Sequence, residues 1–229
     1  MNEFTVSSMT DDAMSDCDAT ALAKRIADKE VSAAEVLEAA ITRAELVNPK
    51  LNAIVTESFA QAKEKARQDA QTHSGKGAFY GVPTFVKDNT DVKGLPTLFG
   101  SNAVANRPAK GNGEFTDQML STGLTIIGKS TMPEFGIPPT TESIAQGATC
   151  NPWNINHSSG GSSGGAAALV ASGVVPIAHG NDGGGSICIP AAACGLVGLK
   201  PTRNRLVNMH GTDALPINVG HEGVITRSV

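Results

Sequence analysis

The sequence predicts an α/β layered fold, because segments with helical and with strand character alternate along its 229 residues. Short runs of β-branched and aromatic residues stand between turns rich in glycine and proline. Hydrophobic residues make up 40% of the chain, so it can bury a sizeable core in one large domain or two small ones. The sequence has no internal repeat with the period of a solenoid.

Helices are expected to open the chain. Leu22 and Ile26 lie four residues apart in an alanine-rich segment, as they would on one face of a helix. Ser32 and Glu35 have the spacing of a capping box, which begins a second helix. That helix is expected to end at residues 48–49, because Pro49 disfavours helical backbone in the residue before it. Further helices are expected over residues 59 to about 70, 114–121 and 166–171.

Strands are expected where short apolar runs occur. The run 82–86 is followed by Lys87, so a lysine is expected at the end of that strand. Residues 154–159 are polar and lack strand character, and the glycine-rich residues 181–186 are expected to form a turn. The expected strands are 51–55, 82–86, 124–127 and 174–178, and the residues expected to be buried after the turn are Ile187, Ile189, Leu196, Val197 and Leu199.

Composition and charge disfavour several classes of function. The net charge is −4 and the sequence has no basic block, so nucleic acid is not an expected partner. The first residues lack the pattern of a secretion signal, and no run of about 18 apolar residues occurs, so we expect a cytoplasmic protein without membrane contact. The cysteine spacing favours free thiols over a disulfide framework. The cysteines are Cys17, Cys150, Cys188 and Cys194.

Residues 160–165, written GGSSGG, are compatible with several kinds of structure. A flexible linker would be flanked by featureless polar sequence, but an apolar, helix-forming run begins here at Ala166. A Walker-type phosphate loop requires Lys followed by Ser or Thr after its last glycine, and Ala166 stands in that place. The sequence therefore disfavours both.

A nucleophile elbow is a minor alternative, which would make the protein an α/β-hydrolase esterase. The segment satisfies the pattern G-x-S-x-G twice, but an elbow joins a buried strand to a helix, and the polar residues 154–159 come first. His179 and His221 are otherwise expected to be packed or solvated. The downstream residues that would serve such a site are His179, His210, His221, Asp182 and Asp213.

Three other residues together indicate a different kind of site. Burial at a strand end would lower the pKa of Lys87 and provide a neutral amine as a base. Ser162 would relay a proton to that amine from Ser186. The three glycines before Ser186 let backbone N–H groups converge beside its hydroxyl, as in an oxyanion hole. Each feature alone is typical of an ordinary surface or turn residue, so the prediction depends on their combination.

These segments, in their order along the chain, resemble the amidase signature family. The strongest matches are residues 81–88 (GVPTFVKD), 160–165 (GGSSGG) and 182–187 (DGGGSI), followed by matches at 190–191, 194–195 and 198–202. The resemblance extends from about Asp18 to Val229 and implies a mixed twisted sheet flanked by helices. It is greatest to members that open cyclic amides such as the 6-aminohexanoate cyclic dimer.

The resemblance implies a role for each matching residue. Ser186 would be the nucleophile that forms an acyl-enzyme with an amide carbonyl, Ser162 the bridging serine after a cis peptide bond, and Lys87 the general base. No metal and no cofactor is required. The backbone amides implied to bind the oxyanion are those of Gly183, Gly184, Gly185 and Ser186. The residues implied to support the site are Asp88, Asp182 and Ser163.

Two positions near the implied nucleophile depart from the family pattern. Gly183 stands where many members have Thr, and Cys188 stands where they have Arg. Glycine at the first position loosens the loop, and the second change removes a fixed charge. Because Lys87, Ser162 and Ser186 are all present, we expect a difference in substrate preference, with the chemistry retained.

The family pattern also sets an expectation for the extent of the domain. Residues 1–17 are expected to be a flexible N-terminus, and residues 18–229 the N-terminal part of an amidase signature domain without its C-terminal half. The expected function is hydrolysis of a small linear or cyclic amide. The alternatives are a catalytically silent subunit that binds a complementary C-terminal chain, and a glutamine-hydrolysing subunit of a tRNA-dependent amidotransferase. The expected partner is a small-molecule amide, with a homodimer or a complementary chain as further alternatives.

Overall fold

The computed structural model describes residues 3–72, 76–209 and 216–229 of the chain. Its helices are α1 (Ala19–Ala27), α2 (Ala33–Leu51), α3 (Phe59–Thr72), α4 (Glu114–Ser121), α5 (Gly164–Ala171) and α6 (Cys188–Cys194), together with the 3₁₀ helix η1 (Glu134–Gly136). Its strands are β1 (Ile54–Glu57), β2 (Pro83–Lys87), β3 (Thr125–Ser130), β4 (Glu142–Ser143), β5 (Gly147–Ala148), β6 (Cys150–Asn151), β7 (Asn154–Ser158), β8 (Ile177–Asp182), β9 (Val197–Leu199) and β10 (His221–Thr226).

Six of the strands in the described residues form two three-stranded sheets that meet where β2 lies beside β8. The first has the order β1-β3-β2, with β1 antiparallel and β2 parallel to β3. The second has the order β8-β10-β9, with both outer strands antiparallel to β10. At the junction, the Thr84 hydroxyl donates to the Ile177 carbonyl at 3.0 Å. The predicted mixed α/β architecture is confirmed, and the end of β2 is placed against the middle of β8.

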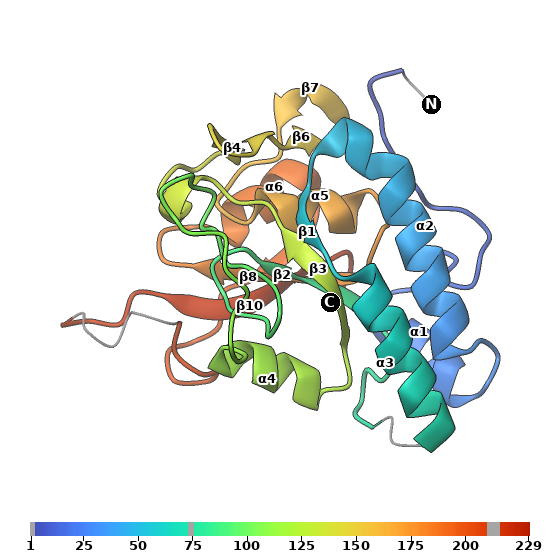
Figure 1. Cartoon of the computed structure of the whole chain (residues 1–229). Coiled ribbons are helices and arrows are strands. Elements are labelled where there is room, and N and C mark those ends of the chain that lie inside the picture. The colour runs from blue at the N-terminus through green and yellow to red at the C-terminus, as the bar shows by residue number, and fades with distance from the viewer. Residues whose placement is uncertain (1–2, 73–75, 210–215) are drawn as a thin grey trace.

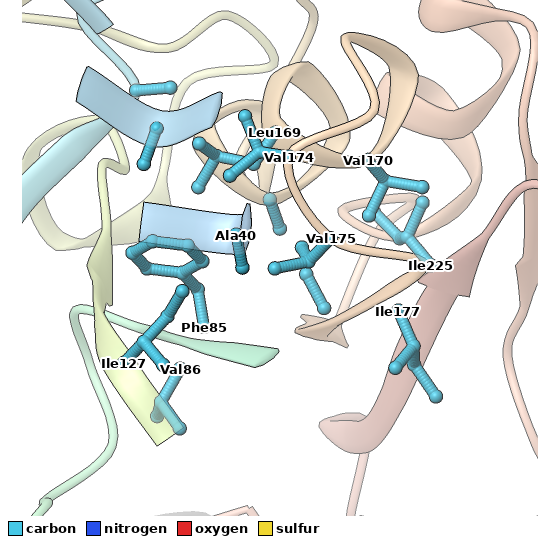
Figure 2. Close-up of a cluster of buried hydrophobic side chains, with 14 of the residues drawn as sticks. Ala40, Phe85, Val86, Ile127, Leu169, Val170, Val174, Val175, Ile177 and Ile225 are labelled. Carbon is cyan, nitrogen blue, oxygen red and sulfur yellow. The ribbon is translucent and has the colours of Figure 1, made fainter. Parts of the chain in front are cut away.

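The helices pack around these sheets and close one core. Figure 1 shows α2 and α3 side by side, while α5 and α6 lie next to each other near β8 and β10. Figure 2 shows side chains from both sheets and from α2 and α5 in a single cluster, including Ala40, Phe85, Leu169 and Ile225, each with 0% exposure. Helix α5 is buried on all sides except at its last residue, as is typical of a central helix without charged residues.

Residues 3–17, expected to form a flexible N-terminus, lie against the body of the domain. The Val6 amide donates to the Pro152 carbonyl and the Ser8 amide to the Ser172 carbonyl, both at 2.8 Å. The Met14 side chain is only 1% exposed. The segment therefore shares the core of the domain that follows it.

Arg43→Leu is expected to lower the free energy of unfolding by about 3 kcal/mol, because the buried Arg43 guanidinium connects this segment to α2. It pairs with both carboxylate oxygens of Asp12, at 2.7 and 2.8 Å. Urea denaturation measures the effect, and Lys24→Leu, which removes an exposed cation beside Asp28, should leave the midpoint unchanged. Equal losses in the two variants would contradict the prediction. The other acceptors that Arg43 serves are the carbonyls of Thr10, Ser15 and Gly173.

The expected end of the second helix is wrong by two residues. Helix α2 has the predicted capping box between Ser32 and Glu35, but it continues through Pro49. It ends where Asn52 adopts a left-handed conformation and donates its amide to the Asn48 carbonyl, so the helix closes after the proline. The next strand consequently begins at residue 54, not at 51.

Two strand predictions are also wrong, because pairing over long sequence distances decides them. Strand β8 runs to Asp182, where the sequence predicts a turn, because β10 pairs with it along its whole length and places His221 opposite Asp182. Residues 154–158, expected to lack strand structure, form β7 in a ribbon with β6. The Asn151 side chain donates to the Ser158 carbonyl across this ribbon at 3.2 Å, so polar residues suffice to hold it.

The residues expected to be buried after the glycine-rich turn divide into three groups. Ile187 is buried as predicted, Leu196 and Val197 are half-buried, and Ile189 and Leu199 are 38% and 69% exposed. Ile189 lines the cavity described below, and Leu199 lies on the edge strand β9. Within the described part of the chain, no helix combines the length and the apolar character needed to cross a membrane.

Candidate active site

The structure brings Lys87, Ser162 and Ser186 to one cavity of about 250 Å³. Lys87 is the last residue of β2, Ser162 lies in the loop before α5, and Ser186 lies in the turn between β8 and α6. Lys87 and Ser162 are 1% and 2% exposed. The Lys87 Nζ donates to Ser162 Oγ at 2.8 Å.

The loop that holds Ser162 owes its shape to the surrounding glycines. The peptide bond between Gly161 and Ser162 is cis, as the family resemblance implies. A Cβ at Gly164 would lie 2.3 Å from Thr141 Oγ1, and one at Gly165 would lie 2.4 Å from Thr131 Oγ1, so only glycine allows this close approach. The GGSSGG segment thus begins a buried helix and is not a linker.

Asn181, on β8, is a second partner of Lys87 that the sequence did not indicate. Its Oδ1 accepts a hydrogen bond from Lys87 Nζ at 2.8 Å. Asn181 is itself held by Asn89: each side-chain amide donates to the oxygen of the other, at 3.0 and 3.2 Å. This pair keeps the Asn181 oxygen directed at the amine. Both asparagines line the cavity. The sequence predicts a turn at residue 181, so no local signal identifies Asn181 before the strand pairing is known.

Burial lowers the pKa of Lys87 from its usual 10.5 to about 7, and the negative charges of Glu222 and Asp182 oppose this effect. Near neutral pH a large fraction of the Lys87 side chain is therefore an uncharged amine. Such an amine has a lone pair that can accept a proton, which is what a general base requires.

The Asp182 carboxylate organises the turn that contains Ser186. It accepts the amides of Gly185 at 2.6 Å and Ile187 at 2.9 Å. Burial raises the pKa of Asp182, but these backbone hydrogen bonds outweigh it and leave the pKa below its usual value. The carboxylate is therefore charged near neutral pH.

These contacts correct one expectation about the oxyanion hole. The Gly185 amide is already donated to Asp182, so it is not free to bind an oxyanion. The amides of Gly183, Gly184 and Ser186 have no acceptor among residues 3–72, 76–209 and 216–229, and all three residues line the cavity. The available donors are thus these three amides.

The other two residues implied to support the site, Asp88 and Ser163, make contacts with groups other than the Lys87 amine. Asp88 is fully buried and pairs with Lys129 at 3.2 Å, and it also accepts the Leu98 amide, so it holds the loop that follows β2. The Ser163 amide donates to the Ser186 carbonyl at 3.3 Å and links the two serine loops. The described residues contain no group of three His, Cys, Asp or Glu side chains that could hold a metal ion.

The nucleophile-elbow alternative finds little support in this geometry. The strand before the GGSSGG segment, β7, is a partly exposed ribbon strand and not the buried strand that an elbow requires. His179 is buried on β8 and bonded to Glu222 and the Lys87 main chain. His210 and Asp213 lie outside the described residues. All four cysteines are free thiols, as predicted.

Comparison with known proteins finds one matching family model and several similar proteins. A family model described as Amidase matches residues 35–229. The chain is 48% identical over 225 residues to the putative amidase AmiC of Mycobacterium tuberculosis (strain ATCC 25618 / H37Rv), a match that covers 98% of this chain and 47% of that protein. It is 43% identical over 218 residues to the 6-aminohexanoate-cyclic-dimer hydrolase of Paenarthrobacter ureafaciens, which covers 93% of this chain and 43% of the hydrolase.

A solved structure has the same architecture. A bacterial aryl acylamidase of the amidase signature enzymes superposes with a TM-score of 0.85 at 35% identity, over 92% of this chain and 45% of that one. The chain thus spans less than half the length of the relatives that it matches.

Proposed function

The chain belongs to the amidase signature family, and from this premise we propose that it hydrolyses carboxylic amides with Ser186 as nucleophile, Ser162 as proton relay and Lys87 as general base. The observation that supports the proposal most directly is the 2.8 Å contact between the Lys87 amine and the Ser162 hydroxyl, in a cavity that Ser186 also lines. The pKa of about 7 for Lys87 suits this role at neutral pH.

In the first half of the proposed reaction, Ser186 Oγ attacks the amide carbonyl carbon. The Ser186 proton passes to Ser162 Oγ while the Ser162 proton passes to the neutral amine of Lys87. The carbonyl oxygen becomes an oxyanion and accepts the free amides of the turn before and at Ser186. When the C–N bond breaks, the protonated Lys87 returns a proton through Ser162 to the leaving nitrogen, which departs as an amine and leaves an ester on Ser186.

In the second half, water attacks the ester carbonyl. Its proton passes by the same path to Lys87, and the ester C–O bond breaks to release the carboxylic acid. The proton then returns to Ser186 Oγ, which restores the starting state. Asn181 contributes in both halves, because its oxygen keeps one N–H of Lys87. Once the amine is neutral, its lone pair can then accept from Ser162 across the 2.8 Å contact.

The cavity favours a substrate with an apolar carbon skeleton. The side chains of Phe135, Ile137 and Ile189 line it and are 51%, 82% and 38% exposed, so they provide apolar surface beside the serines. The 43% identity to a hydrolase of the 6-aminohexanoate cyclic dimer agrees with this preference. We propose small uncharged amides, linear or cyclic, as the substrate class.

Reaction with a fluorophosphonate, which modifies activated serines, tests the proposal on the chain as it is. We expect intact-mass spectrometry to show one adduct per chain, and peptide mapping to place it on Ser186. The adduct should be absent from Ser186→Ala and unchanged in Ser172→Ala, because Ser172 lies at the far end of α5, where its hydroxyl donates to the Leu169 carbonyl at 3.3 Å.

An adduct on another serine would contradict the assignment of the nucleophile. A chain with normal far-UV circular dichroism and no adduct would contradict the proposed activity and favour the silent subunit. Release of acid and amine from linear and cyclic amides, followed by mass spectrometry, would then identify the substrate class.

A further inference from the structure

A buried carboxylate, Glu222, lies behind the proposed general base and has no part in the mechanism above. It is 2% exposed and its Oε2 lies 2.8 Å from Nε2 of His179, which is fully buried. The other ring nitrogen of His179, Nδ1, accepts the backbone amide of Lys87 at 3.1 Å. The Glu222 carboxylate, the His179 imidazole and the main chain of Lys87 are thus connected by two successive hydrogen bonds.

The direction of these hydrogen bonds is fixed by their chemistry. A backbone N–H can only donate, so Nδ1 of His179 must accept from Lys87 and carries no proton. The ring proton is then on Nε2, which donates it to Glu222. The Phe115 ring lies against the imidazole, with 4.9 Å between ring centroids, and limits its rotation.

The pairing of the strands explains how Glu222 and His179 come to contact the main chain of Lys87. The Lys87 amide lies at the edge of β2 where β2 meets β8, and its usual ladder partner is replaced by the His179 side chain. Glu222 stands opposite Asn181 in the pairing of β10 with β8. One pair of strands therefore holds both the main chain of Lys87, through His179, and its amine, through Asn181.

We propose that Glu222 is a positioning residue of the active site, which acts through His179 to hold the end of β2 and with it the amine of Lys87. This inference rests on the proposed function, because it assigns a purpose to the position of the base.

The charges around Lys87 support the same conclusion. The titratable groups that face it, among the described residues, are Glu222 from β10 and His179 and Asp182 from β8. Asp88, the next residue along the chain, is paired with Lys129. The Glu222 charge opposes the fall in the pKa of Lys87 that burial causes.

The test is a titration of Lys87 by NMR in the full chain labelled with ¹³C at the lysine ε position, with Lys87→Met to assign the signal. We expect a midpoint near 7 for the unmodified chain. Glu222→Gln keeps an acceptor for His179 but removes the charge, so the midpoint should fall by roughly one pH unit. Glu114→Gln is the control, because Glu114 is exposed and lines a second cavity that Glu222 also lines. This variant should leave the Lys87 midpoint unchanged.

Two further measurements separate this inference from a merely structural role. Because the neutral amine is the active form, the rising limb of Ser186 labelling should shift to lower pH in Glu222→Gln, with labelling about fivefold faster than in the unmodified chain at pH 6. Long-range ¹H–¹⁵N NMR of the unmodified chain should show the His179 proton on Nε2, and this needs no variant to fold.

Each outcome decides one question. An unchanged Lys87 midpoint in folded Glu222→Gln, or a His179 proton on Nδ1, would overturn the inference. A shifted midpoint in a chain that is not labelled on Ser186 would leave the inference standing and overturn the proposed function.

Discussion

Replacing Lys87 by methionine is expected to slow the labelling of Ser186 about 10³-fold and, at the same time, to raise the free energy of unfolding at pH 7 by about 2 kcal/mol. The loss of labelling follows because methionine cannot accept a proton. The gain in stability follows because a lysine buried with a pKa of about 7, far below its usual 10.5, opposes folding. Methionine removes that cost but loses the hydrogen bonds to Ser162 and Asn181.

The stability effect has a defined pH dependence. Between pH 7 and 10.5 the unfolded chain keeps the Lys87 proton and the folded chain releases it, so the folded state gains stability as the pH rises. The cost of burying Lys87 is therefore fully present below about pH 7 and disappears near 10.5. The advantage of Lys87→Met in urea denaturation should be largest at pH 6, smaller at pH 9, and lost at higher pH.

Lys129→Met is the matched control, because Lys129 is also fully buried but is paired with Asp88. Its removal leaves the Asp88 carboxylate buried without its partner, so the variant should lose about 3 kcal/mol. Opposite signs in the two variants are the expected result. A destabilised Lys87→Met chain at pH 6 would mean that the lysine is held as a structural cation and not as a neutral base.

The sequence predicts best those parts of the fold that depend on near neighbours in the chain. The capping box that begins α2 and the bounds of α4 are both as expected, since helical periodicity and caps act within one or two turns. The extent of β8 and the existence of β7 depend on strands that pair with them, so their local composition misleads.

The residues of the candidate site divide in the same way, into those that local sequence marks and those that strand pairing brings into place. Ser162 and Ser186 could be selected because glycine-rich motifs mark the unusual backbone around them, and Lys87 because it ends a predicted apolar strand. Asn181 and Glu222 could not, because their positions follow from the pairing of β8 with β10 and from the meeting of β8 with β2. Segments more than 90 residues apart come together there, for example Lys87 and Asn181, which are separated by 94 positions. The sequence predicts that Asp182 supports the site, but only the hydrogen bonds of the structure reveal that its carboxylate already accepts the Gly185 amide.

Ser162→Ala is expected to slow the labelling of Ser186 about 10²-fold to 10³-fold, with a small loss of stability. Ser162 is the group through which the Lys87 amine would receive the Ser186 proton, and alanine breaks that path while Lys87 keeps its contact with Asn181. Intact-mass kinetics measure the rate, and Ser172→Ala is the matched control, since Ser172 is an equally buried serine at the other end of α5 and does not line the cavity. Equal rates for the two variants would contradict the relay.

The double variant Lys87→Met/Ser162→Ala separates a relay from two independent contributions. If Ser162 and Lys87 act as one path for the proton, removing the second residue after the first costs little more, so the double variant should be about as slow as the slower single variant. Two independent contributions would instead multiply. A relay also predicts that labelling of Ser162→Ala no longer rises with pH around 7, because the amine of Lys87 still titrates there but is disconnected from Ser186. A multiplied loss together with a retained pH dependence would show that Lys87 reaches Ser186 without Ser162.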